Sequence, residues 1–415
     1  MMDLNIGLLN AFNKVRYVIC IGAFIGLGIS NTTAQSTFSF SALADFEYAK
    51  AGSKSHYYYN EIDKDAIDGS FSIAQLNLMG RVNINKQWIL NARVLLERDK
   101  GQKVDNFAIP QLNIQWVSKK RKVGITVGSF TNPFGAFNQK QLSTQRNFIG
   151  LPLAYGYYNN ISSNIGFVED MGDIAKIAID GEVQWGSTNL YYGGYTTGAM
   201  FSWNIFPGKV NWKIALVNGA SNLQKQLSGP LQYGVISRLK IRPTYFWEQG
   251  FSVSHGTFYQ SSEVSDQLDE IVNFKQSMLG MDFKLGKGYF EFTGEVIGSF
   301  YKVPQFNEDG LAFEVNTINA PLSLSNLAVN LDIKYELPFI QGSYIAYRID
   351  HLRYSKLENS STQKWDNNVL RHSFAIGYHI NQYILTRATV STQQVDNKEW
   401  DKKLGTFRLM LTAHF

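Results

Sequence analysis

Charged side chains recur at every second position in several segments of this chain. Arg238, Lys240 and Arg242 alternate with apolar residues, and a β-strand would place the three cations on one face. Such a row could guide anions through a wet passage by raising their local concentration. Carboxylates recur in the same way further along, at Glu291, Glu295, Asp332 and Glu336. A neutral lining of mixed charge is therefore the alternative to an anion path, and the sequence leaves both open.

Strands of about ten residues are the elements that would position these side chains. The last segment, residues 405–415, shows the alternation most clearly, because one face would carry Phe407, Leu409, Leu411, Ala413 and Phe415. The same period recurs in residues 276–296 and 326–337, with charged residues on the second face. A charge on a lipid-facing surface near the membrane midplane costs roughly 2 to 4 kcal/mol. The charged face should therefore line a wet lumen, and Arg387 should point inward.

The composition supports a membrane protein that crosses with strands. Aromatic residues make up 14% and charged residues 18% of the 415 residues, and the mean hydropathy is −0.18. The first 34 residues resemble a secretory signal peptide, with Lys14 and Arg16 before an apolar run at 17–29 and a small-residue junction at 32–34. Cys20, the only cysteine, lies in that run and would be lost on cleavage. The net charge of +5 is too small and too dispersed to indicate nucleic acid as a partner.

Backbone groups inside a bilayer must pair with one another, so residues 35–415 should form a closed barrel. We expect an all-β, transmembrane, antiparallel β-barrel in the outer membrane of a Gram-negative bacterium. Eight short turns are recognisable, and with both chain termini on the same side of the membrane they give 18 strands. Sixteen strands is the alternative, because residues 172–206 are hard to divide into strands and turns. One of these turns is placed at residues 186–188. Pro110 interrupts a strand and should sit at a bulge or an unpaired position.

Residues 131–173 form the longest expected connection. A connection of that length in a compact fold is usually functional or disordered, and its aromatic residues favour order. It is therefore the candidate constriction loop, with Phe134, Lys140, Arg146, Tyr155 and Tyr157 as its candidate residues. The tyrosines could stack against sugars, or they could only pack the loop against the barrel wall, which we favour.

Three short segments resemble a known family. The stretch GSFTNPFG at residues 128–135 is similar to a strand-end segment of outer-membrane porins related to the phosphate-selective (O and P) type. Residues 215–219 and the stretch from Trp365 to Tyr378 also resemble that group. The resemblance implies a porin whose long loop folds into the lumen, with a homotrimer as one assembly. The loop carries only Lys140 and Arg146 as cations, so phosphate selectivity is not implied. The Ala-Gln junction and the many Asn and Tyr residues resemble Bacteroidetes proteins.

Catalysis is the least favoured function. A site in the barrel wall would need a nucleophile or an activated water beside a histidine or carboxylates. His351 and His372 should lie near the external rim, but both should face the lipid headgroups, and no serine lies obviously between them. We also find no metal-ligand spacing and no nucleotide motif. The sequence predicts no catalytic residues, no metal and no cofactor.

The main hypothesis is passive diffusion of small hydrophilic solutes through a barrel embedded in outer-membrane lipid. The alternative is a barrel scaffold or a component of a secretion or assembly complex. The terminal Phe415 resembles the signal that hands such barrels to their assembly machinery. The candidate pore-lining residues are Arg81, Arg93, Arg238, Lys240, Glu291, Glu295, Asp332, Lys334, Arg348 and Arg371.

Overall fold

The computed structural model describes residues 37–51, 69–97, 106–163, 166–167, 187–190, 194–221, 232–258, 274–307, 312–313, 320–357, 363–396 and 404–415. The expected signal peptide lies outside these residues. Among the residues described, no helix is long and apolar enough to cross a membrane.

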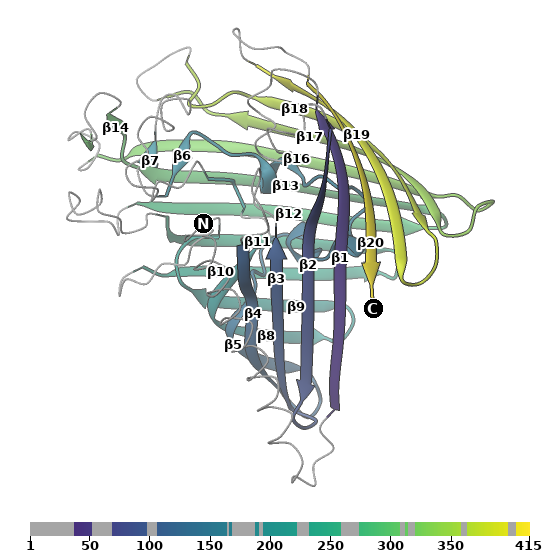
Figure 1. Cartoon of the computed structure of the whole chain (residues 1–415). Helices are drawn as coiled ribbons and strands as arrows, with labels where there is room; N and C mark the ends of the chain where they lie inside the picture. Colours follow the sequence, from purple (N-terminus) through teal and green to yellow (C-terminus); the bar gives the residue numbers. More distant parts are fainter. Residues whose placement is uncertain are drawn as a thin grey trace, which may run out of the picture.

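Sixteen antiparallel strands of the described chain close into one barrel, in which each strand pairs with its neighbours in sequence and β1 pairs with β20 (Figure 1). Two small two-stranded sheets lie outside this order, β6 (Ile161–Ser162) with β7 (Gly166–Phe167) and β14 (Phe306–Asn307) with β15 (Ala312–Phe313). The barrel strands are β1 (Thr37–Ala51), β2 (Ser70–Asn83), β3 (Trp88–Glu97), β4 (Asn106–Val117), β5 (Val123–Thr131), β8 (Tyr195–Phe206), β9 (Val210–Val217), β10 (Gly234–Thr244), β11 (Trp247–Thr257), β12 (Lys275–Lys287), β13 (Phe290–Val303), β16 (Leu322–Glu336), β17 (Ser343–Tyr354), β18 (Val369–His379), β19 (Ile384–Val395) and β20 (Leu404–His414).

The strand number is the lower end of the expected range of 16 to 18. Seven of the eight expected short turns join paired strands, and two strands per turn plus the two terminal strands give 2 × (7 + 1) = 16. The eighth, at residues 186–188, does not, because Ser187 forms an isolated bridge with Asn159 instead. The connection between β5 and β8 therefore extends beyond residue 173 and ends only at Tyr195.

The alternation predicted from the sequence sets which face of each strand points inward. On β20, Phe407, Leu409 and Leu411 are 40 to 43% exposed on the outer surface, whereas Met410 and Thr412 are buried inside. Arg387 on β19 is buried inside as predicted. The barrel thus presents an apolar outer surface and a polar inner one.

Pro110 occupies an irregularity in the pairing of β3 with β4. Arg93 lies opposite Gln111 and Leu95 opposite Ala108, so two residues of β4, Ile109 and Pro110, face one residue of β3. The carbonyl of Pro110 accepts a hydrogen bond from the Ser129 hydroxyl at 2.7 Å. This bulge confirms the expectation, since Pro has no N–H to donate to the ladder.

Candidate functional site: the loop inside the barrel

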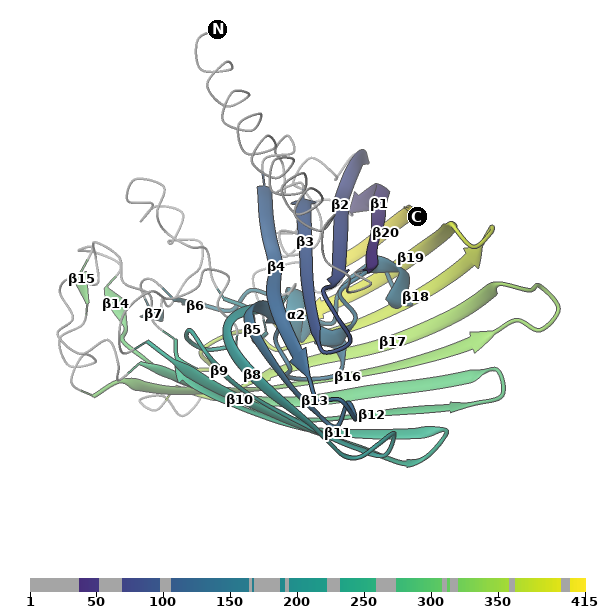
Figure 2. The same ribbon diagram turned by 90° about the horizontal axis from the view of Figure 1, so that it is seen from below.

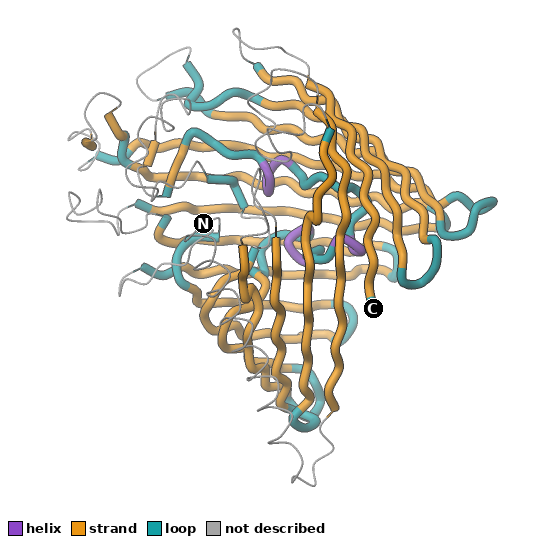
Figure 3. Tube along the Cα trace, in the orientation of Figure 1, coloured by secondary structure: helices purple, strands orange, loops and turns teal. Residues whose placement is uncertain are grey.

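The chain between β5 and β8 enters the barrel, and we call its residues 132–163 the lumen loop. The Asn132 N–H donates to the Gly194 carbonyl at 2.5 Å, so both ends of the connection meet at the wall. The Asn132 side chain accepts the Phe134 N–H at 2.9 Å and forms the turn that starts the loop. The loop then makes two 3₁₀ turns, Phe137–Gln139 and Ser143–Gln145, and the single helical turn α2 (Leu153–Gly156). Figures 2 and 3 show α2 and these turns inside the ring of strands.

Glu295 on β13 holds the lumen loop at two points. Its carboxylate accepts the Ala136 N–H at 2.9 Å through Oε1 and the Tyr155 hydroxyl at 2.9 Å through Oε2. The neighbouring Gly135 N–H donates to the Ser252 hydroxyl at 3.1 Å. Burial beside the Glu295 carboxylate raises the pKa of Tyr155 well above its ordinary value, so the Tyr155 hydroxyl stays protonated and donates.

The same contact makes Gly135 a sensitive position. Its φ is +70°, and a Cβ there would lie 2.3 Å from Oε1 of Glu295. Gly288, in a turn of the wall, has a similar φ of +61° but open space around it. Gly135→Ala should therefore destabilise the barrel more than Gly288→Ala, with a backbone cost of about 1–3 kcal/mol common to both. Thermal unfolding of the two variants in detergent checks this, and equal melting temperatures would contradict the close approach.

Three arginines on adjacent strands hold the other side of the lumen loop. Arg348 on β17 donates to the Gly150 carbonyl at 3.0 Å, and Arg371 on β18 donates to the Leu151 carbonyl. Arg387 on β19 donates to two loop carbonyls, those of Ser143 at 2.7 Å and Arg146 at 2.9 Å. We call Arg348, Arg371 and Arg387 the arginine row. It fixes the path of the loop backbone by charged hydrogen bonds, which are stronger than neutral ones.

Two members of the arginine row also have carboxylate partners on the wall. Arg348 contacts Asp332 through two hydrogen bonds of 2.6 and 2.7 Å, and Arg371 contacts Asp350 at 2.9 Å. All four side chains are at most 5% exposed. A buried charge requires a partner of opposite charge. Each of these two guanidinium groups has a carboxylate partner on the wall while it also binds the loop.

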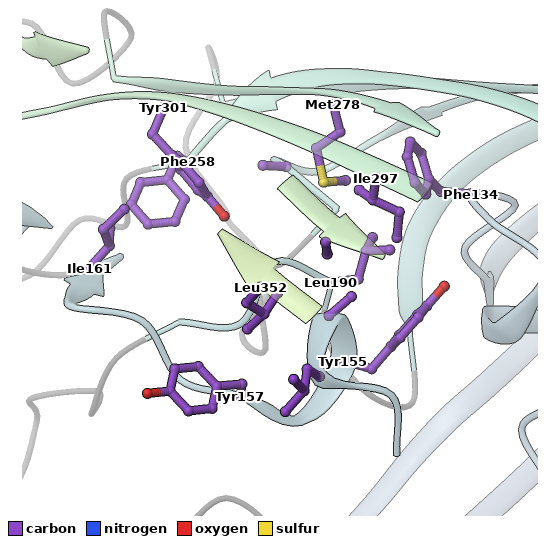
Figure 4. Close-up of a cluster of buried hydrophobic side chains, with 14 of the residues drawn as sticks. Phe134, Tyr155, Tyr157, Ile161, Leu190, Phe258, Met278, Ile297, Tyr301 and Leu352 are labelled. Carbon is purple, nitrogen blue, oxygen red and sulfur yellow. The ribbon is translucent and has the colours of Figure 1, made fainter. Parts of the chain in front are cut away.

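Apolar side chains of the lumen loop pack against the barrel wall towards the ends of the strands remote from the short turns. Phe134, Tyr155, Tyr157 and Ile161 are at most 2% exposed. Figure 4 shows them in one cluster with wall residues that include Met278, Ile297, Tyr301 and Leu352. Burying a side chain of this size contributes about 1.5–3 kcal/mol. This part of the barrel interior is therefore a packed core.

The connection between β17 and β18 folds onto the same cluster. The Trp365 ring is 1% exposed, and its indole N–H donates to the Ser325 carbonyl at 2.8 Å. The next residue, Asp366, accepts the Asn160 N–H at 3.0 Å and the Asn367 N–H at 2.6 Å. Burial raises the pKa of Asp366 to about 7, against the opposing effect of these hydrogen bonds. Asp366 thus ties this connection to the lumen loop.

A cleft of about 290 Å³ separates the lumen loop from the wall of β9 to β13 and β16. Arg238 and Asp282 form a buried pair with hydrogen bonds of 2.7 and 2.8 Å, and Lys240 contacts Glu248 at 3.4 Å. Lys140 lines the cleft from the loop, and burial lowers its pKa. The cleft is therefore polar, with charges of both signs.

Solved structures of bacterial outer-membrane proteins share this architecture. An anion-selective porin from Comamonas acidovorans superposes with a TM-score of 0.58 at 7% identity, covering 92% of this chain and 100% of that one. The chain has the porin fold. The outer-membrane channel DcaP of Acinetobacter baumannii gives 0.57 at 10% identity, with coverages of 92% and 99%. OmpT of Vibrio cholerae, in a form described as a trimer, gives 0.54 at 7% identity, also with 92% and 99%. No protein-family model and no curated protein matches the chain in sequence.

Within this porin fold, the ten candidate pore-lining residues all lie on inward-facing positions, but in different settings. Arg238, Lys240, Glu295 and Asp332 line the cleft, whereas Arg348 and Arg371 belong to the arginine row under the loop. The other four have partners on the wall: Glu291 contacts Lys284 at 2.7 Å, Lys334 contacts Glu336 at 2.9 Å, Arg93 donates to Asn77 at 2.7 Å, and the exposed Arg81 donates to Asn83 at 3.3 Å.

The five candidate residues of the expected constriction loop also lie in different settings. Phe134, Tyr155 and Tyr157 are buried in the packed cluster, which favours wall packing over sugar stacking. Arg146 is buried, and its carbonyl accepts from Arg387. Lys140 alone among the five lines the cleft.

Sequence reasoning missed several residues that hold this site. Asp45 accepts hydrogen bonds from Gln75 at 2.5 Å, from the Ser143 hydroxyl of the loop at 2.8 Å and from Thr412 at 2.5 Å. Lys213 lines the cleft from β9. The alternation predicts that both face inward, but it carries no information on which loop atom they meet.

The two histidines weighed for catalysis lie on the outer surface of the barrel. His372 Nδ1 is 2.6 Å from the Tyr347 hydroxyl, and both side chains are exposed on that surface. His351 shares the outward face of β17 with Tyr347 and Arg353. Among the described residues, no group of three His, Cys, Asp or Glu side chains could hold a metal ion.

Proposed function

We propose that this protein is an outer-membrane porin that admits small hydrophilic solutes by passive diffusion. The observation that carries the proposal is the charged cleft between the lumen loop and the wall, inside a barrel whose strands alternate apolar-out and polar-in. A polar interior beside an apolar exterior is the arrangement of barrels that conduct water and solutes across a membrane.

Aromatic residues near the short turns support the membrane location. A girdle of such side chains anchors a barrel at the membrane–water interface. Residues of this kind that remain exposed near this end are Phe38, Trp88, Phe206, Tyr245, Phe339 and Phe415. The proposal includes export through the signal peptide at residues 1–34 and assembly through the terminal Phe415. A homotrimer is part of it, because the similar OmpT is described in a trimer form.

A scaffold with an incidental pore is the second candidate. The packed cluster of the lumen loop, in which Tyr157 and Ile161 are almost fully buried, favours it, because it fills part of the interior with apolar side chains (Figure 4). The two functions differ in what they require of the cleft, since only a porin needs it to conduct.

Single-channel recording of the purified protein in a planar bilayer separates the two. A porin gives steady conductance, and its reversal potential under a tenfold KCl gradient reports the sign of the dominant charge in the passage. Silence at all voltages would overturn the porin and favour the scaffold.

Removing the lumen loop together with the rest of the connection to β8 should raise the conductance several-fold, because the lumen loop occupies the interior. The Asn132 N–H and the Gly194 carbonyl already meet at 2.5 Å, so a short Gly-Ser turn can replace residues 133–193 without moving β5 or β8. The matched control replaces residues 222–231, between β9 and β10, by the same turn and should leave the conductance unchanged. An unchanged conductance in the loop variant would exclude the loop as the constriction.

A further inference from the structure

Cations gather on one part of the barrel rim that the short turns form. They lie in three neighbouring turns, those between β2 and β3, between β4 and β5, and between β8 and β9. The short turns of outer-membrane barrels face the periplasm. We call the six exposed cations of these turns the basic arc: Lys86, Lys119, Lys120, Arg121, Lys122 and Lys209.

Backbone hydrogen bonds join the elements that carry the basic arc into one continuous stretch of the rim. The Val117 N–H, just before the β4–β5 turn, donates to the Gln87 carbonyl of the β2–β3 turn at 2.8 Å. On the other side, the Asn204 N–H of β8 donates to the Lys122 carbonyl at 2.7 Å. The Ser118 hydroxyl accepts the Lys122 N–H at 3.1 Å and so shapes the middle turn. The backbone and Ser118 therefore set the conformation of this turn without help from its cationic side chains.

The basic arc has no carboxylate beside it. Among the described residues between 69 and 221, the only acidic side chain is Glu97, at the opposite end of β3. None of the six cations forms a side-chain hydrogen bond or an ion pair with a residue in the described ranges. Further round the same rim, Arg242, Lys284 and Lys334 each contact a glutamate at 2.7 to 2.9 Å. The described part of the chain therefore leaves the positive charge of the basic arc unbalanced.

Tryptophans mark the level of the membrane surface beside the basic arc. Trp88 is paired with Trp116 across β3 and β4, and Trp203 with Trp212 across β8 and β9. Trp88 and Trp203 are 41% and 40% exposed on the outer surface of the barrel. Tryptophan side chains in such barrels lie at the headgroup level of the bilayer. Because Trp88 closely follows Lys86 in the chain, the basic arc lies within reach of the lipid phosphates.

We propose that the basic arc binds the phosphate groups of anionic phospholipids in the leaflet at the short-turn rim. Lysine and arginine donate charged hydrogen bonds to phosphate oxygens, and a cluster of cations beside a bilayer attracts anionic lipid. A second copy of the same arc is disfavoured as the occupant, because like charges would face one another. This interaction goes beyond the proposed porin function, since a barrel that never conducts would still bind these lipids.

Quenching of tryptophan fluorescence by brominated lipids tests the basic arc, because four tryptophans lie beside it. The purified protein is reconstituted into phosphatidylcholine vesicles with increasing fractions of brominated phosphatidylglycerol, and brominated phosphatidylcholine is the reference. The wild type should prefer phosphatidylglycerol roughly tenfold at low ionic strength. Lys119→Gln combined with Lys120→Gln should lower this preference roughly fivefold, the effect of about one cation beside an anionic surface. The matched control, Lys50→Gln combined with Lys302→Gln, removes two exposed cations at the opposite rim and should leave the preference unchanged.

A further variant separates lipid binding from the shape of the turn. Arg121 has a φ of +51°, a left-handed conformation that glycine adopts without steric cost. Arg121→Gly should therefore lower the preference for phosphatidylglycerol, while the melting temperature in detergent does not fall. Equal quenching of the wild type by the two lipids, or a preference that the arc variants retain, would overturn the proposal. Tryptophans that neither lipid quenches would indicate a second copy of the chain on this face and would overturn it as well.

Discussion

Replacing Arg348 by methionine should destabilise the barrel by about 3–5 kcal/mol, the usual cost of removing one partner of a buried ion pair. Arg348 is 1% exposed, and its guanidinium lies 2.6 and 2.7 Å from the two oxygens of Asp332. Methionine has a similar length but no charge, so Asp332 would remain buried as an uncompensated carboxylate. The melting temperature in detergent measures this loss.

A second variant separates the ion pair from the attachment of the loop. Arg348→Met combined with Asp332→Leu removes both charges and should recover most of the lost stability, because a buried pair replaced by apolar residues is often nearly neutral. The hydrogen bond to the Gly150 carbonyl stays missing in both variants, so the open-channel current noise should remain above wild type in both. Arg353→Met, exposed on the outward side of the same strand, should change neither quantity. Full loss of stability in the double variant would show that the loop contact, and not the ion pair, dominates.

The barrel itself could be predicted from the sequence because its register follows from a local rule. Charged residues at every second position must avoid lipid, and this condition placed Arg387 and the charged face of residues 326–337 inside. The strand number does not follow from this rule, since residues 186–188 resemble a hairpin turn but belong to a segment in which Ser187 bridges Asn159. Aromatic and small residues alternate in both settings, so the pattern alone does not distinguish a wall strand from an enclosed loop.

The arrangement of the candidate site could not be predicted, because its contacts join residues far apart in the chain. Arg348 and Arg371 were expected beside the pore, yet both bind backbone carbonyls of the lumen loop, about 200 residues earlier in the chain. A backbone carbonyl leaves no trace in the sequence. Lys140 is recognisable as a cation of the long loop, but its position in the lining of the cleft depends on how the loop is folded.

Asp366 should make the attachment of the β17–β18 connection to the lumen loop depend on pH. Its pKa is raised from 3.8 to about 7 because burial of the carboxyl group disfavours its charged form. For an acid with a raised pKa, the folded state binds the proton more tightly than the unfolded state does. The contribution of Asp366 to the free energy of unfolding is therefore largest below about pH 4. It decreases as the pH rises towards 7, by on the order of 4 kcal/mol over that interval.

Comparison of two variants isolates this contribution from the other carboxylates. Asp366→Asn keeps the shape and stays uncharged, so the decrease of its melting temperature between pH 5 and pH 8 should be clearly smaller than that of the wild type. Asp396→Asn is the matched control, because Asp396 is exposed and paired with Lys364 at 2.9 Å, and its melting temperature should follow the wild-type slope. Hydrogen exchange at the Asn160 amide, which donates to Asp366, reports the same opening locally, and its protection in the wild type should decrease between pH 5 and pH 8. A wild-type slope that survives in Asp366→Asn would place the pH dependence elsewhere in the barrel, because no other change of charge separates the two proteins.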